Sequence, residues 1–342
     1  YKFLSSLLLN LHNYIGENLA DIVISSNDGG SPEVIVNTQM NVTATEVSDN
    51  VNGTWTKEDS PYLVSGDITI IPGDTLIIEP GVEIYIDNDL RFDVLGALFA
   101  EGAESDSIRF APINDYWLSI NFSSYADNSS ILDYCVIEGA ANSSSGAYYG
   151  SINANESDPT ISNSTIRNNG FTHDHDHDRS TCNGINLSGS NAIIENNKFE
   201  TIIGNGIFSE EGGSPQIRNN TITDVGGHGI YISGGNSSSV IDNTLSSISS
   251  KGIVISSNDS TVVSGNTLAE IGGDGITISD SPYAQILNND IPTSGKGITI
   301  SNSLSAQILN NSITNTGDGI TISSSQYAQI LNNNITSAGK GI

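Results

Sequence analysis

Apolar and polar positions follow a pattern in this chain that returns every 22 or 23 residues. One column of the pattern is asparagine, at Asn197, Asn220, Asn243, Asn266, Asn289, Asn311 and Asn333. Two places after each asparagine stands an apolar residue, and by subtraction these lie 23, 23, 23, 23, 22 and 22 apart: Phe199, Ile222, Leu245, Leu268, Ile291, Ile313 and Ile335. A second column, in phase with the first, is Ile preceded by Gly: Ile185, Ile207, Ile230, Ile253, Ile276, Ile298, Ile320 and Ile342. A period this constant predicts a stack of similar units, each contacting its neighbours.

A single unit predicts three short strands and no helix. In residues 297–318, Gly297-Ile-Thr-Ile-Ser alternates apolar and polar residues, Ala306-Gln-Ile-Leu forms a second apolar run, and Ser312-Ile313 forms a third. Alternation with a period of two is typical of strands, and the segments between are rich in Asn, Ser and Gly, as turns are. We therefore expect an all-β solenoid of 22–23 residues per coil.

The two invariant columns are expected at corners of the coil. Asparagine tolerates the left-handed backbone conformation of a sharp corner, and stacked amides can bond along the axis as a ladder. The glycine before each isoleucine is expected to serve another corner, with a positive φ.

Several motifs resemble those of right-handed parallel β-helix proteins of the pectin-lyase-like superfamily. They are GTWT at 53–56, SPYLVSGDITI at 60–70, GDTLIIEPGV at 73–82 and GALFAEG at 96–102, followed by the repeats, so that the resemblance covers about residues 54–342. It implies a right-handed β-helix from residue 62 to residue 342, of about twelve coils at the observed period. The resemblance implies no particular reaction, because this fold carries lyases, hydrolases, adhesins and stalks.

The N-terminal part has a different pattern. Residues 22–43 read as two strands about a turn, and residues 1–45 resemble the last strands of an immunoglobulin-like module of bacterial surface proteins. Residues 46–61 are expected to be a linker. The chain stops within a coil at Gly341-Ile342, so we expect the natural β-helix to continue or to be covered by another chain.

The composition excludes several classes of binding partner. The formal net charge is -28 with only 11 Lys and Arg, so nucleic acid and an anionic membrane surface are not expected partners, and no run of residues is apolar enough to insert into a membrane. The aromatic content of 6% disfavours a large stacking platform. An acidic chain rich in Ser, Asn, Thr and Gly suits a secreted protein, extracellular or on the cell surface, whose acidic surface could bind Ca²⁺. The two cysteines, Cys135 and Cys182, are interpreted as buried small residues or as a disulfide pair.

One segment departs from the repeat and carries candidate metal ligands. The spacing from Ile166 to Phe199 is 33, which predicts an insertion of about ten residues. Within it lie alternating histidines and aspartates: His173, Asp174, His175, Asp176, His177 and Asp178. Imidazoles suit Zn, Cu or Ni and carboxylates suit Ca or Mg, so His173, His175, His177, Asp174 and Asp176 are a candidate site for a divalent metal; the alternative is a solvated loop.

Two further features bear on catalysis. Gly227-His228-Gly229 matches a short motif of polygalacturonases, yet paired aspartates are not recognisable in adjacent coils. Few basic residues are available for a lyase in the middle coils, namely Arg167, Arg179, Lys198 and Arg218. From Lys251 on, the position before the glycine column alternates in charge and predicts a ladder of ion pairs along the axis: Lys251, Asp274, Lys296, Asp318 and Lys340.

These observations favour a non-enzymatic extracellular structural protein: a surface stalk, an adhesin or a filament subunit that associates with itself. The alternative is a β-helix that binds or degrades a polysaccharide. The two differ in one respect, because an enzyme should interrupt the ladders with a cleft that holds several carboxylates and at least one Arg or Lys.

Overall fold

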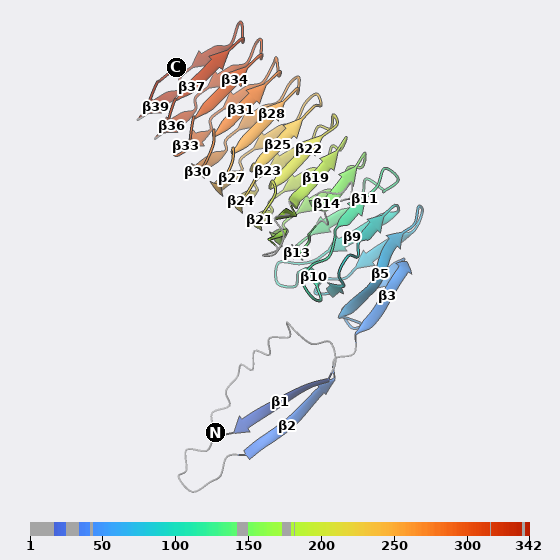
Figure 1. Ribbon diagram of the computed structural model, residues 1–342. Helices are drawn as coiled ribbons and strands as arrows, with labels where there is room; N and C mark the ends of the chain where they lie inside the picture. The colour runs from blue at the N-terminus through green and yellow to red at the C-terminus, as the bar shows by residue number, and fades with distance from the viewer. Residues whose placement is uncertain are drawn as a thin grey trace, which may run out of the picture.

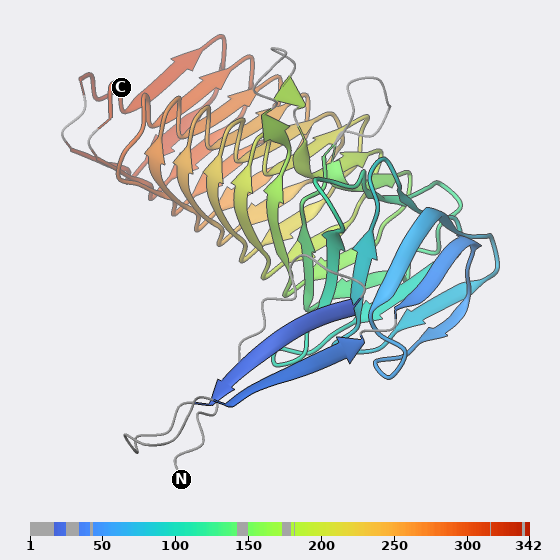
Figure 2. The same ribbon diagram turned by 60° about the horizontal axis from the view of Figure 1, so that its bottom comes forward.

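The computed structural model describes residues 17–24, 34–41, 44–141, 150–172, 179–180, 182–314, 316–336 and 339–342. Among these residues there are strands, turns and bends but no helix. From Thr45 onward the chain winds into a stack of coils, each built of three strands that pair in parallel with their counterparts in the coils before and after (Figures 1 and 2). The predicted all-β solenoid is therefore confirmed, and one of its three faces holds 12 strands, one from each coil.

The coil has three faces, which we number in the order in which the chain visits them. Face 1 carries β8 (Phe92–Val94), β11 (Ile120–Phe122), β14 (Gly150–Asn155), β19 (Asn183–Ser188), β22 (Ile207–Glu210), β25 (Ile230–Ser233), β28 (Ile253–Ser256), β31 (Ile276–Ser279), β34 (Ile298–Ser301) and β37 (Ile320–Ser323). Face 2 carries β4 (Gly53–Trp55), β6 (Thr75–Ile78), β9 (Ala97–Glu101), β12 (Ile131–Asp133), β15 (Thr160–Ser162), β20 (Ile193–Glu195), β23 (Gln216–Arg218), β26 (Ser239–Ile241), β29 (Val262–Ser264), β32 (Gln285–Leu287), β35 (Gln307–Leu309) and β38 (Gln329–Leu331). Face 3 carries β3 (Thr45–Asn50), β5 (Tyr62–Ile70), β7 (Glu83–Ile86), β10 (Ile108–Pro112), β13 (Cys135–Glu138), β16 (Thr165–Asn169), β21 (Lys198–Ile202), β24 (Thr221–Val225), β27 (Thr244–Ile248), β30 (Thr267–Ile271), β33 (Asp290–Ile291), β36 (Ser312–Thr314) and β39 (Asn334–Thr336).

The first coils begin earlier than expected. β3 pairs in parallel with β5, and β4 pairs in parallel with β6, so residues 46–61 carry strands of the solenoid rather than a linker. The long strand β5 turns the corner between two faces, because residues 62–64 pair with β7 and residues 68–70 pair with β8. Upstream, β1 (Glu17–Ile24) and β2 (Val34–Asn41) are the two expected strands and pair antiparallel. Their membership of an immunoglobulin-like module stays a prediction.

The interior is one continuous apolar core built from the alternating strand residues. Ile230 and Ile232 of β25 are fully buried, while Tyr231 between them points outward, and the same alternation recurs along face 1. Face 3 adds the apolar column seen in the sequence, from Phe199 to Ile313, all fully buried. Stacking therefore buries an apolar surface that a single coil would leave exposed.

The asparagine column forms the predicted ladder between faces 2 and 3. The Nδ2 of Asn243 donates to the Oδ1 of Asn266 at 3.0 Å and to the carbonyl of Ile217 at 3.0 Å, and the same pair of bonds recurs in the neighbouring coils. The left-handed conformation, however, belongs to the residue before each asparagine, such as Asn219 (φ 57°) and Asp242 (φ 55°). The ladder amide and the corner conformation are thus supplied by two adjacent residues, and not by one as expected.

The glycine column has a different cause from the one expected. None of the glycines at 184, 206, 229, 252, 275, 297 and 319 has a positive φ. A Cβ at Gly252 would instead come within 2.5 Å of the Leu268 Cδ2 and 2.6 Å of the Gly275 carbonyl oxygen, and the other members of the column meet the same two neighbours. Glycine is required here because the next coil approaches too closely for any side chain.

Candidate groove on face 1

A ladder of side chains runs along the corner between faces 3 and 1, at the position before the glycine column. The main-chain N–H of Asn205 donates to the Oδ1 of Asn183 at 2.8 Å, and that of His228 donates to the Oδ1 of Asn205 at 2.8 Å. The N–H of Lys251 donates in turn to the Nδ1 of His228 at 3.2 Å. These bonds fix the amides of Asn183 and Asn205, which line a groove, in one column with the imidazole of His228.

Beyond Lys251 this column was expected to be a ladder of ion pairs. One pair of the column is present among the described residues, with 3.9 Å between the Lys251 Nζ and an Asp274 carboxylate oxygen. Asp274 accepts a hydrogen bond from the Thr299 hydroxyl at 3.1 Å, and Asp318 and Lys340 form a backbone bridge. Among the described residues, the alternating charge of this column therefore yields a single long ion pair, in which Asp274 also accepts from a hydroxyl.

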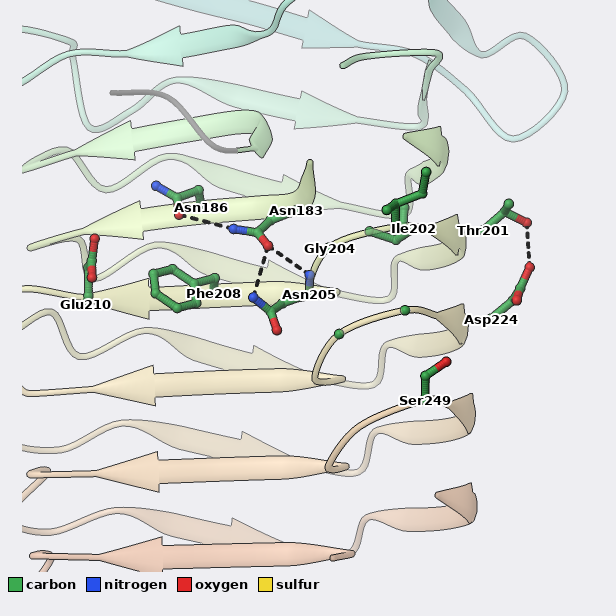
Figure 3. Close-up of a pocket in the computed structure, with 13 residues that line it drawn as sticks. Asn183, Asn186, Thr201, Ile202, Gly204, Asn205, Phe208, Glu210, Asp224 and Ser249 are labelled. Atoms are coloured by element: carbon green, nitrogen blue, oxygen red, sulfur yellow. Dashed lines mark hydrogen bonds between the residues drawn. The ribbon is translucent and has the colours of Figure 1, made fainter. Parts of the chain in front are cut away.

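The groove has a volume of about 730 Å³ and crosses successive coils where face 3 turns into face 1 (Figure 3). Its walls combine amides, small turn residues, an aromatic ring and two carboxylates: Asn183, Asn186, Thr201, Ile202, Ile203, Gly204, Asn205, Phe208, Glu210, Asp224, Gly226, Gly227 and Ser249. Glu210 lies at one side of the residues drawn and Asp224 at the other, with Phe208 and the amides between them (Figure 3). Asp224 accepts a hydrogen bond from the Thr201 hydroxyl at 2.9 Å.

One amide of the groove is available to a ligand. The Asn183 Oδ1 accepts two hydrogen bonds from Asn205, one from its main-chain N–H at 2.8 Å and one from its Nδ2 at 3.0 Å. It approaches Asn186 only weakly, at 3.5 Å from its Nδ2 to the Asn186 Oδ1. The Nδ2 of Asn186 makes no hydrogen bond within the part of the chain that the structure describes. An amide with unused donors in a groove suits a ligand rich in hydroxyl groups.

Aromatic side chains continue the same wall along the outward side of face 1. Phe208 stacks on Tyr231 with ring centroids 5.0 Å apart and an interplanar angle of 7°, and the His228 ring lies 5.7 Å from Tyr231. The outward column changes character at this point. In register along face 1, it reads Asp93, Asn121, Asn153, Asn186, Phe208, Tyr231, Val254, Thr277, Thr299 and Thr321.

The surroundings of His228 favour its neutral form. Burial and the nearby charge of Lys251 lower its pKa below the usual 6.5. Its Nδ1 accepts the Lys251 N–H, so the proton of the neutral ring sits on Nε2. The imidazole acts as one rung of the corner ladder, a structural role that the polygalacturonase-like motif did not indicate.

Among the described side chains of the middle coils, Arg167, Lys198 and Arg218 are engaged in ion pairs away from the groove. Glu138, on face 3, lies between two arginines: it contacts the guanidinium of Arg109, and the Arg167 Nε approaches it at 2.7 Å. Burial raises the pKa of Glu138, but the two arginines outweigh burial and bring it below its usual range. Arg218 pairs with Glu195 and Lys198 pairs with Glu200, each at 2.6 Å. None of the groove-lining residues is an arginine or a lysine.

The candidate metal ligands lie outside the described residues. His173, Asp174, His175, Asp176 and His177 all fall in the segment 173–178, between β17 (Phe171–Thr172) and β18 (Arg179–Ser180), which pair antiparallel. The insertion itself is confirmed, because Ile166 and Phe199 are register partners despite their spacing. Among the residues described, no three His, Cys, Asp or Glu side chains are placed to hold a metal ion.

The cysteines are buried small residues and form no disulfide. Cys135 stands at the start of the asparagine ladder, where its N–H donates to the Ser164 hydroxyl at 2.9 Å and the Ser164 N–H donates to Asn197. Burial raises the pKa of its thiol far above the usual value. Of the two interpretations drawn from the sequence, the buried small residue is therefore confirmed for Cys135.

Sequence reasoning missed the groove itself. Its weak signal was a run of substitutions at outward positions of face 1, where Asn186, Phe208 and Tyr231 replace the threonine of later coils. The scarcity of aromatic residues directed attention away from a stacking site, whereas two adjacent rings suffice to form one.

Comparison with known proteins confirms the fold. The model of the right handed beta helix region matches residues 118–243 and residues 183–335, which together cover more than half of the chain. The chain therefore belongs to the right-handed β-helix family, and the predicted handedness is confirmed. A curated relative, Protein bark beetle of Drosophila melanogaster, is 38% identical over 60 residues, which are 18% of this chain and 2% of that protein.

Solved structures with a similar fold include an alginate epimerase and a mannuronan epimerase. The periplasmic alginate epimerase AlgG gives a TM-score of 0.58 at 13% identity, with 85% of this chain and 84% of that chain covered. The A-module of the mannuronan C-5 epimerase AlgE6 of Azotobacter vinelandii gives 0.56 at 13% identity, with 87% of each chain covered. At this identity the likeness concerns the fold.

The structure contains no helix with the length and apolar character needed to cross a membrane, as judged over the described residues.

Proposed function

We propose that this protein is an extracellular polysaccharide-binding β-helix whose binding site is the groove on face 1. The observation that carries this proposal is the stacked pair Phe208 and Tyr231 beside the amides of Asn186 and Asn205. Aromatic rings pack against the apolar faces of sugar rings, while amides donate to and accept from hydroxyl groups, so the two together suit a glycan.

The order of the two sequence-based hypotheses is thereby reversed. A stalk, adhesin or self-associating filament was favoured because the later coils are nearly identical copies. The similar fold of the alginate and mannuronan epimerases favours the polysaccharide hypothesis instead. A smooth stalk also gives no reason for a groove of about 730 Å³ in which the Asn186 Nδ2 has no acceptor among the described residues.

Binding is favoured over bond cleavage. A β-helix that removes a proton from a uronate or cleaves a glycosidic bond needs converging acid and base groups and, for a uronate, a cation near the sugar carboxylate. Among its described lining residues, the groove offers Glu210 and Asp224 on opposite sides and no cationic side chain. His228 is engaged as an acceptor through its Nδ1.

Binding to a panel of soluble polysaccharides, measured by affinity electrophoresis and calorimetry, tests the proposal. Phe208→Ala and Tyr231→Ala should each weaken binding about tenfold, the size of one lost aromatic contact. Tyr283→Ala is the matched control, since Tyr283 is exposed on a turn outside the groove and its loss should change nothing. If no polysaccharide binds the wild-type protein, or if the groove variants bind as it does, the proposed function is wrong.

A further inference from the structure

The charge of the groove sets it apart from a site for acidic sugars. Both titratable side chains that line it, Glu210 and Asp224, are carboxylates. The surrounding chain carries a formal net charge of -28, so its field adds to theirs. A polyuronate entering the groove would bring a carboxylate on each sugar into this field.

Among the described side chains of these coils, the nearest cations are already engaged in ion pairs of their own. Lys198 and Arg218, from the coils that build the groove, are paired with Glu200 and Glu195 at 2.6 Å. Lys251, which follows in the corner column, lies 3.9 Å from Asp274, in the coil beyond it. Bringing one of these side chains to the groove would require breaking its own ion pair.

The same carboxylates favour hydroxyl groups. A carboxylate accepts hydrogen bonds from sugar hydroxyls, and these charge-assisted bonds are stronger than neutral ones. Glu210 lies on the strand of Phe208, two residues further on, so it stands beside the aromatic ring on the outward side of face 1. An uncharged hexose chain offers hydroxyl donors to the carboxylates, apolar ring faces to the aromatic side chain and oxygen atoms that accept hydrogen bonds from the amides.

Resting on the proposed function, we infer that the groove selects uncharged polysaccharides and discriminates against polyuronates. In this respect the protein would differ from the alginate and mannuronan epimerases of similar fold. The fold is shared, and the charge of the groove decides the ligand class.

The test compares a neutral β-glucan and a glucomannan with alginate and polygalacturonate at low and moderate salt, in the presence of EDTA to exclude bridging by Ca²⁺. The neutral polymers should bind the wild-type protein, and the polyuronates should bind at least about tenfold more weakly at low salt, a gap that narrows as salt screens the groove. Equal or tighter binding of either polyuronate under these conditions would overturn the inference.

Charge-removing variants sharpen the result. Glu210→Gln and Asp224→Asn together should raise polyuronate binding several-fold while binding of the neutral polymers falls, because charge-assisted acceptors are lost. Glu270→Gln is the control: Glu270 accepts from the Ser247 hydroxyl at 2.9 Å in the same kind of turn as Asp224 but lies outside the groove. If the double variant discriminates as strongly as the wild-type protein, the inference fails.

The outcomes separate the two claims. If polyuronates bind in a manner that Phe208→Ala abolishes, the proposed site stands and the inferred ligand class is wrong. If no polymer of either class binds, the proposed function falls and the inference falls with it.

Discussion

The coils that form the groove differ from the coils that follow them, although both share one core. Register partners on face 1 up to and including the groove coils are Ile120, Ile152, Ile185, Ile207 and Ile230, separated by 32, 33, 22 and 23 residues, whereas Ile253, Ile276, Ile298 and Ile320 of the following coils are separated by 23, 22 and 22. In the later coils the outward column becomes threonine, at Thr277, Thr299 and Thr321. In the groove coils the same column carries Asn186, Phe208 and Tyr231.

The difference teaches where a solenoid can vary. The asparagine ladder and the glycine column run unbroken through both regions, because each rung bonds or packs against the next coil. Outward side chains and turn lengths have no such partner and are free to change. Regularity therefore marks what holds the stack together, and departures from it on the outward face mark where a ligand can bind.

The largest expected effect tests the shared ladder. Asn220→Ala, beside the groove, and Asn266→Ala, in the regular coils, should each cost about 4 kcal/mol of unfolding free energy, because several buried donors and acceptors lose their partner at once. Each amide donates to the next asparagine and to a buried carbonyl, and accepts two hydrogen bonds from the asparagine before it. Chemical denaturation measures both, with the exposed Asn236→Ala as a control near zero. A large cost at one site and none at the other would break the claim that both regions share one frame.

A smaller effect is expected at the ion cluster of the early coils. Glu138→Gln leaves Arg109 and Arg167 without their common carboxylate, and we expect a loss of about 2 kcal/mol, below the usual cost for a buried pair because Arg167 is partly exposed. The folded state lowers the pKa of Glu138, so its contribution is complete above its ordinary pKa and disappears as pH falls through the folded value.

Denaturation curves from pH 7 to pH 3 measure this contribution. The stability gap between wild-type protein and Glu138→Gln should be constant near neutrality and should close in acid. Glu200→Gln serves as the control, since its pair with Lys198 is more exposed and should contribute little. A gap that widens in acid would contradict the assignment.

One buried side chain of the groove coils is expected to be replaceable with a gain in stability. Ser209 is 1% exposed, and its hydroxyl has no hydrogen-bond partner among the described residues. Its register partners are Leu187 and Ile232, both apolar. Ser209→Val should raise the unfolding free energy by about 1 kcal/mol, because it removes an unsatisfied buried polar group. Thermal unfolding measures this, and a lower melting temperature would show that the hydroxyl has a partner or that the space is too small.

The smallest effect concerns the pH dependence of the corner ladder. Because burial lowers the pKa of His228, its protonation opposes folding, so stability should decline as pH falls through the ordinary histidine pKa of about 6.5. His228→Asn continues the amides of Asn183 and Asn205 and should remove this decline while preserving the ladder. The unfolding free energies of both proteins, measured between pH 5.5 and pH 7.5, test this prediction. An unchanged decline in the variant would show that another titratable group causes the decline.

The sequence predicted what repeats and left unpredicted what does not. The period, the three strands, the asparagine ladder and the insertion after Ile166 all follow from columns of identical residues. The corner roles were assigned to the wrong atoms: glycine was expected to supply a positive φ, and the structure shows a close approach to Leu268 and its counterparts. The same glycine also approaches the Gly275 carbonyl of the next coil, and a contact between coils is not revealed by a single repeat.

The groove could not be found in the same way, because it depends on where turns of different length bring Asn186, Phe208 and Asp224 together. The alternating charges from Lys251 onward produce one long ion pair, with Asp274. The spacing of charged residues does not specify which partner a long exposed side chain contacts. The metal site predicted at His173, His175 and His177 stays a prediction.

Hydrogen exchange in the presence of the tightest-binding neutral polysaccharide tests the central claim most directly. The account predicts added protection in β19, β22 and β25, around Asn183, Phe208 and Tyr231, and unchanged exchange in β31, β34 and β37 of the regular coils. Protection confined to the regular coils, or spread evenly over both regions, would contradict the assignment of binding to the groove.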